Sequence, residues 1–247
     1  MPDVKRRSRA HRPTRLVATM VLAASLLAGG TLVAASAPAL RGKLVGWDKL
    51  VPQLYADAAK SDAHRYTWRE PSPTVKQDFR KLSANVSRDV CVVALGNGTA
   101  QPHEPVAVKI TGGRLSPSTI VLSVGSRLSF KNIDPFPHVL FEAGDAKWGP
   151  NPTGPGSARE WAASTPGVHI IRDQLFPSIV MYVVVDPAAV EYALPDHDGA
   201  FSLPIPAGEY ALKVFFDGKQ VGKEDGVRVG EKGLELKEPI ALAGDAK

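Results

Sequence analysis

Short runs of alternating apolar and polar residues fill the chain from about residue 88 onward, and this pattern predicts β-strands. Most runs are about four to eight residues long, are rich in Val, Ile and Phe, and are bounded by Gly, Pro, Asn or Asp. Their spacing is typical of an antiparallel sandwich, so we expect an all-β, Greek-key fold. The expected strands are 90–95, 106–110, 119–124, 127–132, 139–142, 167–172, 180–186, 200–203, 209–216 and 226–229.

Residues 41–85 show a different pattern, in which apolar residues recur at helical spacing after Pro52 and after Pro73. Proline is favoured at the first position of a helix, and Ser72 can cap the second of these segments. We therefore expect a spacer with short helices between the N-terminal segment and the β region.

The first 40 residues have the composition of an export signal. Residues 1–15 contain six basic side chains and one acidic one, and residues 16–40 contain no charge. Such a segment is either a secretory signal or an uncleaved membrane anchor, and the sequence leaves both readings open. Either one predicts export to the periplasm or cell envelope, with residues 16–40 anchoring the chain to the inner membrane if they are retained.

The net charge of +5 resides entirely in that segment, because the remaining residues contain 24 basic and 24 acidic side chains. A neutral body argues against a nucleic-acid partner. The single cysteine, Cys91, excludes an intrachain disulfide, and its apolar surroundings predict a buried hydrophobe.

The stretch 115–141 reads LSPSTIVLSVGSRLSFKNIDPFPHVLF. A glycine turn at Gly125, the strand LSFKNID at 128–134 and the following His138 together resemble a cupredoxin of the plastocyanin or azurin type, whose corresponding strand reads V-x-F-x-N-x-D. In that family the histidine supplies the first copper ligand. The resemblance extends through Pro166 and Gly167 and implies a cupredoxin-like sandwich over 86–186.

The rest of the family's ligand set is replaced here. Where cupredoxins read R-C-x-x-H-P-x-M, residues 172–179 read RDQLFPSI, so that Asp173, Phe176 and Ile179 stand in place of the thiolate, imidazole and thioether. A blue-copper site needs two imidazoles and a thiolate. The resemblance therefore implies that no cofactor is bound, and that His138 is a remnant at a surface loop, satisfied by a backbone carbonyl.

An alternative interpretation keeps a metal at this position. One imidazole together with carboxylates can bind copper or zinc, although weakly without a third strong ligand. His138 would then be the metal ligand, with Asp173 and Met181 as neighbours, or with His169 as a second imidazole.

A second resemblance covers 196–221, DHDGAFSLPIPAGEYALKVFFDGKQV. A tight turn at Gly199, a strand with Phe201 and Leu203 on one face, and a return turn at 206–208 are similar to the carboxypeptidase regulatory-like, or transthyretin-like, β module. This resemblance implies a structural or adhesive accessory over 187–247.

No nucleophile elbow, zinc-binding helix or phosphate-binding loop occurs in the chain, so we expect no enzymatic activity. The leading hypothesis is an exported cell-envelope protein that binds a protein or glycan partner through a cupredoxin-like sandwich without blue-copper ligands. One rival is a periplasmic metal-handling protein with a non-blue site around His138. The other is an unfamiliar enzyme with a site beneath an irregular loop at 147–157.

Overall fold

A computed structural model describes residues 38–53, 83–97 and 104–243. Residues 1–37 of the predicted export segment and most of the predicted spacer helices lie outside these residues. Within the described ranges, no helix combines the length and the apolar character needed to cross a membrane.

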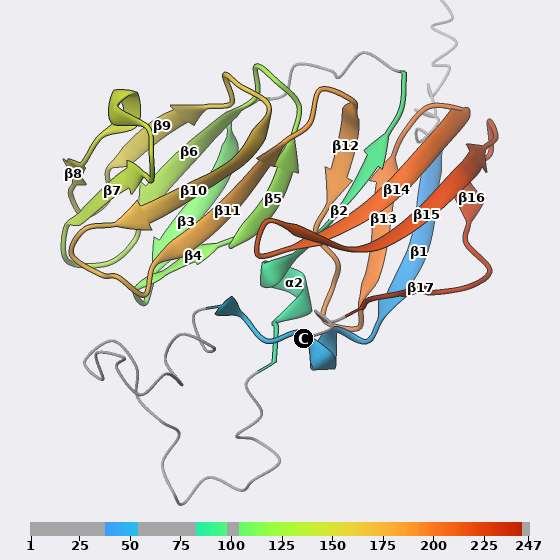
Figure 1. The fold of residues 1–247 in the computed structure, drawn as a ribbon, viewed down its shortest axis with the longest axis horizontal. Helices are drawn as coiled ribbons and strands as arrows, with labels where there is room; N and C mark the ends of the chain where they lie inside the picture. Colours follow the sequence, from blue (N-terminus) through green and yellow to red (C-terminus); the bar gives the residue numbers. More distant parts are fainter. Residues whose placement is uncertain (1–37, 54–82, 98–103, 244–247) are drawn as a thin grey trace, which may run out of the picture. The chain divides into compact units, whose positions relative to one another are not determined.

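The described chain is built almost entirely of β-strands, which confirms the predicted all-β class (Figure 1). Its helices are the single turn α2 (Val86–Asp89) and the 3-10 segments Trp47–Lys49 and Ala146–Trp148. The strands are β1 (Ala39–Val45), β2 (Val90–Leu95), β3 (Val106–Thr111), β4 (Arg114–Ser116), β5 (Thr119–Leu122), β6 (Arg127–Asn132), β7 (His138–Glu142), β8 (Asn151–Thr153), β9 (Ala158–Ala162), β10 (Gly167–Asp173), β11 (Val180–Val185), β12 (Ala189–Ala193), β13 (Ala200–Pro204), β14 (Gly208–Phe216), β15 (Lys219–Val229), β16 (Leu234–Glu235) and β17 (Ile240–Ala241).

A first sandwich is formed by the sheets β4-β3-β6-β9 and β5-β11-β10-β7-β8, whose inner faces share one apolar core. Both sheets are mixed, because most neighbouring strands pair antiparallel, as expected, whereas β3 pairs with β6, and β5 with β11, in parallel. The chain leaves β3 through β4 and crosses to the other sheet as β5, so β6 returns beside β3 in the same direction. Alternation of inward and outward side chains is the same in both pairings, so the sequence pattern did not reveal the difference.

A second sandwich is formed by the sheets β13-β1-β16, with β17 also paired to β1, and β12-β2-β14-β15. Residues 39–45, of which 39–40 were expected in the export segment and 41–45 in the helical spacer, form β1, which pairs with β13. Strand β2, which was expected in the cupredoxin-like region, pairs with β12 and β14. Both differences have one origin, since strands early in the chain pair with strands of its C-terminal part, β1 with β13 and β2 with β14.

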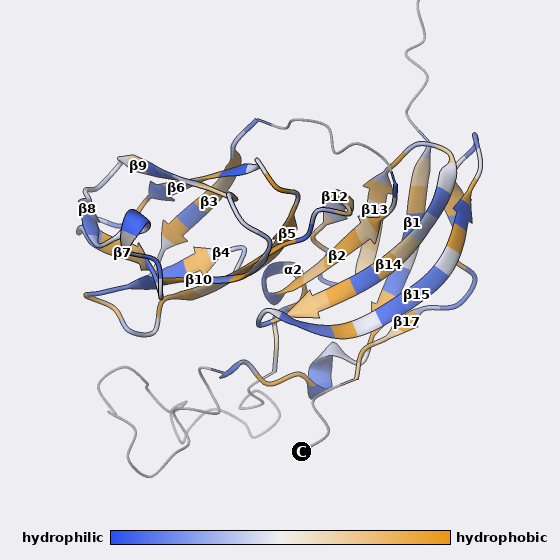
Figure 2. Cartoon of the chain, turned by 45° about the horizontal axis from the view of Figure 1, so that its top comes forward, coloured by the Kyte–Doolittle hydropathy of each residue, from blue (hydrophilic) through white to orange (hydrophobic). Residues whose placement is uncertain are grey.

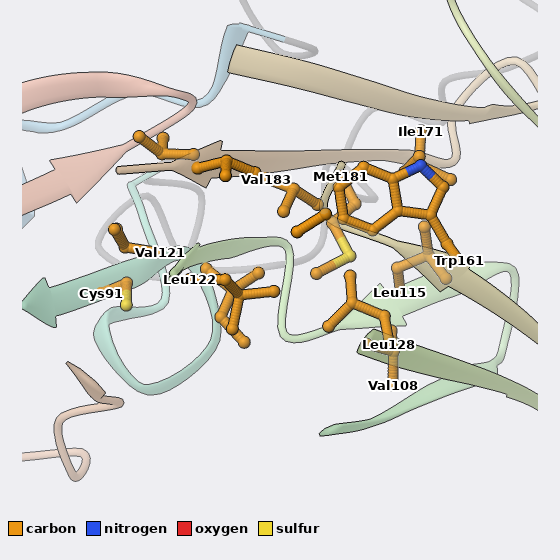
Figure 3. Close-up of a cluster of buried hydrophobic side chains, with 14 of the residues drawn as sticks. Cys91, Val108, Leu115, Val121, Leu122, Leu128, Trp161, Ile171, Met181 and Val183 are labelled. Atoms are coloured by element: carbon orange, nitrogen blue, oxygen red, sulfur yellow. The ribbon is translucent and has the colours of Figure 1, made fainter. Parts of the chain in front are cut away.

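Strand β2 is apolar on both faces because it separates the two cores (Figure 2). Cys91 and Val93 pack in the first core, next to Val121, whereas the alternate residues Val92 and Ala94 pack in the second (Figure 3). A strand covered on both faces reads as a continuous hydrophobic run. This arrangement confirms the predicted burial of Cys91, and burial raises the pKa of its thiol to about 12.

The segment 147–157 is more ordered than the predicted irregular loop. It contains β8, which pairs with β7, and it begins within a 3-10 turn. The Trp148 ring lies 5.6 Å from that of Phe130, and the Arg159 guanidinium lies 3.8 Å from the centre of the Trp148 ring. Arg159 also donates hydrogen bonds to the carbonyls of Leu140 and Gly149. The segment is therefore packed against the first sandwich.

Asp217 occupies the turn between β14 and β15 with a φ of 47°, and its carboxylate accepts a hydrogen bond from the Gln53 amide. Burial, which outweighs that hydrogen bond, raises the pKa of Asp217 to about 6. The folded state thus holds this proton more tightly than the unfolded chain, and stability falls as the pH rises from about 4 to about 6.

We expect Asp217→Asn to raise the free energy of unfolding at pH 7 by about 1–2 kcal/mol, allowing for solvent screening of a partly exposed group. Asparagine tolerates positive φ, and its side-chain carbonyl can still accept from Gln53. Urea denaturation at pH 3.5 and pH 7 measures the effect, with Asp225→Asn as an exposed control. An equally large gain in the free energy of unfolding at pH 3.5 would mean that the stabilisation does not come from removing the buried charge of Asp217.

Candidate functional site

The candidate site lies at the end of the first sandwich where β6 stops and β7 begins. Asn132, the last residue of β6, donates from its amide nitrogen to the carbonyls of Phe136 and Thr153, and its amide oxygen accepts from the Asp134 N–H. Side-chain amides that bond nearby backbone groups fix tight turns in this way. The turn delivers His138 as the first residue of β7, fully buried.

Both ring nitrogens of His138 face carboxylates. Nδ1 lies 2.7 Å from Oδ2 of Asp173, and Nε2 lies 3.1 Å from Oδ2 of Asp134. A ring nitrogen that carries a proton can donate to a carboxylate oxygen, so both nitrogens of His138 have hydrogen-bond partners within the protein. His138 thereby links the β6–β7 loop to the end of β10.

The two carboxylates also hold the neighbouring loops. Asp134 accepts from the backbone amides of Gly112 and Gly113, at 2.6 and 3.0 Å. Asp173 accepts from the amides of Leu175 and Phe176, at 2.7 and 3.1 Å. We call Asp134, His138 and Asp173, with these backbone donors, the His138 network.

Desolvation by itself would raise the pKa of Asp134, but the hydrogen bonds from the two glycine amides and from His138 together lower it below 3.8. A carboxyl group whose pKa is lowered on folding stabilises the native state above its unfolded pKa. That contribution is lost as the pH falls below 3.8 towards the folded pKa.

Two phenylalanine rings enclose the imidazole. The centroids of Phe136 and Phe176 lie 5.2 and 5.1 Å from that of His138, and the two phenyl rings are 5.1 Å apart. Phe176 is the residue that replaces the second imidazole in the cupredoxin resemblance. It supplies an apolar contact in a position where that family has a donor nitrogen.

The structure brings Asp173 beside His138, whereas Met181 lies fully buried in the apolar core, among residues that include Leu115 and Ile171 (Figure 3). The expectation that His138 occupies a surface loop and is satisfied by a backbone carbonyl was wrong. It missed Asp134, whose carboxylate lies within hydrogen-bonding distance of the ring four residues on. In the sequence, Asp134 and His138 stand four residues apart on either side of a proline-rich turn. The periodicity of strands and helices does not predict a contact across such a turn, so this spacing was not recognised as a signal.

These residues do not fit a copper centre. A ring nitrogen that donates to a carboxylate has no lone pair available for a metal, so binding would require the His138 network to break. In the part of the chain that the structure describes, no cluster of three His, Cys, Asp or Glu side chains is arranged to hold a metal ion.

A second histidine network lies at the other end of β7. The Glu142 carboxylate accepts from Trp161 Nε1 at 2.6 Å and lies 2.5 Å from Nδ1 of His169, whose Nε2 is 2.8 Å from the Thr165 carbonyl. His169 lies on β10, as predicted, and Trp161 lies on β9 of the facing sheet. The network therefore joins the two sheets of the first sandwich.

No protein-family model and no curated protein matches the chain. Among solved structures, it is similar to a purple cupredoxin from Nitrosopumilus maritimus, at 21% identity and a TM-score of 0.29, over 33% of this chain and 99% of that one. It is also similar to a copper-containing nitrite reductase from Thermus scotoductus SA-01, at 20% identity and a TM-score of 0.31, over 38% of this chain and 25% of that one. An amicyanin variant matches at 13% identity and a TM-score of 0.30, over 38% of this chain and 98% of that one. Each likeness covers only about a third of this chain, and it carries no statement about metal or activity.

Proposed function

We propose that this chain is an exported, non-catalytic binding or structural protein of the cell envelope, whose cupredoxin-like sandwich has a structural histidine in place of a copper ligand. The observation that supports this proposal is the engagement of both His138 nitrogens by buried carboxylates. Export is supported by the basic and apolar composition of residues 1–40.

The rival with a non-blue metal site would need His138 to exchange one of its carboxylate bonds for a metal bond. The rival enzyme would need a cleft beneath 147–157, whereas that segment packs against the sandwich through Trp148 and Arg159. The geometry favours neither rival over a structural role.

A metal titration of the full chain in detergent separates these functions. We expect calorimetry with Cu²⁺ and Zn²⁺ to show no stoichiometric site that depends on the His138 network, and no intense visible absorbance with Cu²⁺. Asp173→Asn tests the network, and Asp198→Asn is the control, because Asp198 is an exposed aspartate of the second sandwich. Stoichiometric binding that Asp173→Asn abolishes and Asp198→Asn preserves would establish the metal-handling rival.

A further inference from the structure

Three large apolar side chains are exposed at the end of the first sandwich that holds the His138 network. Ile133 is 51% exposed and Phe136 36% in the β6–β7 loop, and Leu175 is 53% exposed in the β10–β11 loop. The half-buried Phe176 joins them, since its ring contacts that of Phe136. We call Ile133, Phe136, Leu175 and Phe176 the apolar loop end. Clusters of this kind on a folded domain mark binding surfaces.

The His138 network holds these residues in place. The Leu175 and Phe176 amides donate to Asp173, and the Phe136 carbonyl accepts from Asn132. His138 joins the two loops through Asp134 and Asp173. A surface that is already ordered loses little conformational entropy when it binds, which favours association.

The charge around the apolar loop end is basic. Arg114 follows the Gly112–Gly113 turn that donates to Asp134, Arg172 directly precedes Asp173 on β10, and both arginines are exposed. Asp134 and Asp173 are the only carboxylates in the contributing segments 111–114, 133–137, 153–157 and 172–179, and both are buried within the His138 network. The exposed surface at this end therefore combines apolar tips with positive charge.

We propose that the apolar loop end docks on an anionic lipid surface. Its apolar side chains insert at the headgroup level, and Arg114 and Arg172 bind the lipid phosphates. Aromatic and aliphatic side chains flanked by basic residues suit that interface. A protein partner is less favoured, because the apolar side chains project from loops and do not line either of two surface pockets found in the described part of the chain. This inference deepens the proposed function by naming the surface bound at the envelope.

A fluorescent label placed at one loop tip tests the proposal on the full chain. The buried thiol of Cys91, with its raised pKa, should not react in the folded protein, so Leu175→Cys can be labelled selectively with an environment-sensitive dye. Val124→Cys is the control, since Val124 is 45% exposed in the turn before β6, at the opposite end of that strand. Any insertion of the N-terminal segment is common to both variants.

We expect vesicles of phosphatidylglycerol and phosphatidylcholine to shift the emission of the label at position 175 to the blue, with no shift at position 124. Pure phosphatidylcholine should give a much weaker response. Arg172→Gln should lower the apparent lipid affinity of the labelled loop about fivefold, which corresponds to the loss of one basic contact.

Equal responses at positions 124 and 175, or none at 175, would overturn the proposal. A label at 175 that ignores lipid and responds only to envelope proteins would overturn it too, and would assign the surface to a protein partner. These outcomes are independent of the metal titration, so lipid docking can fail while the structural role of His138 holds.

Discussion

Replacing His138 by alanine should lower the free energy of unfolding by about 3–5 kcal/mol. The substitution leaves the buried carboxylates of Asp134 and Asp173 without the ring they both contact and opens a cavity between Phe136 and Phe176. Each carboxylate keeps two backbone donors, which limits the loss to the lower part of that range. Urea denaturation followed by circular dichroism at pH 7 measures it.

His197→Ala provides the matched control, since the His197 side chain is 86% exposed. Its substitution should change stability by less than about 0.5 kcal/mol. A comparably small loss for His138→Ala would restore the interpretation of His138 as a surface-loop remnant. The loss should shrink at low pH, because a carboxylate that has lost its partner can then be neutralised by protonation.

The second large effect is expected at Phe130, where substitution by alanine should cost about 3–5 kcal/mol. Phe130 lies on β6, is fully buried in the first core, and contacts the Trp148 ring. Truncation removes its burial and leaves a cavity that the rigid sheets can fill only in part. The same denaturation experiment measures the cost, together with the fluorescence of Trp148.

Phe136→Ala is the matched control for Phe130→Ala, because the same change is made at a loop position where the ring is partly exposed. It should cost about 1–2 kcal/mol, less than Phe130→Ala, because the ring is partly exposed although it contacts His138 and Phe176. Equal losses at the two positions would mean that Phe130 does not fill the core as the structure places it.

Local pattern was enough to predict six of the nine described strands of the first sandwich and four of the eight of the second. Alternation at Phe130 and Leu128, and at Phe201 and Leu203, placed these residues on inward faces, where the structure has them. The continuous apolar run at β2 also predicted a buried strand. These predictions depend only on the two-residue period of a strand and on the turn residues that bound it.

The sequence also singled out His138 and Asp173, through a resemblance that places both near one end of a sandwich. It did not predict their chemistry. A histidine can bind a metal, form a hydrogen bond to water or donate to a carboxylate. The outcome depends on which side chains other strands place within about 3 Å of it. Asp134 reaches His138 across a turn that Asn132 fixes, and Asp173 reaches it from β10.

By itself, then, the sequence determined the all-β class, the inward faces of the strands and the burial of Cys91. Only the tertiary structure decided that β1 and β2 complete the second sandwich, that β3 and β6 run in parallel, and that His138 links two loops. The reason is physical. Period and turn chemistry act over a few neighbouring residues, whereas strand partners and buried polar contacts join residues far apart in the chain, and nothing local to either partner specifies them.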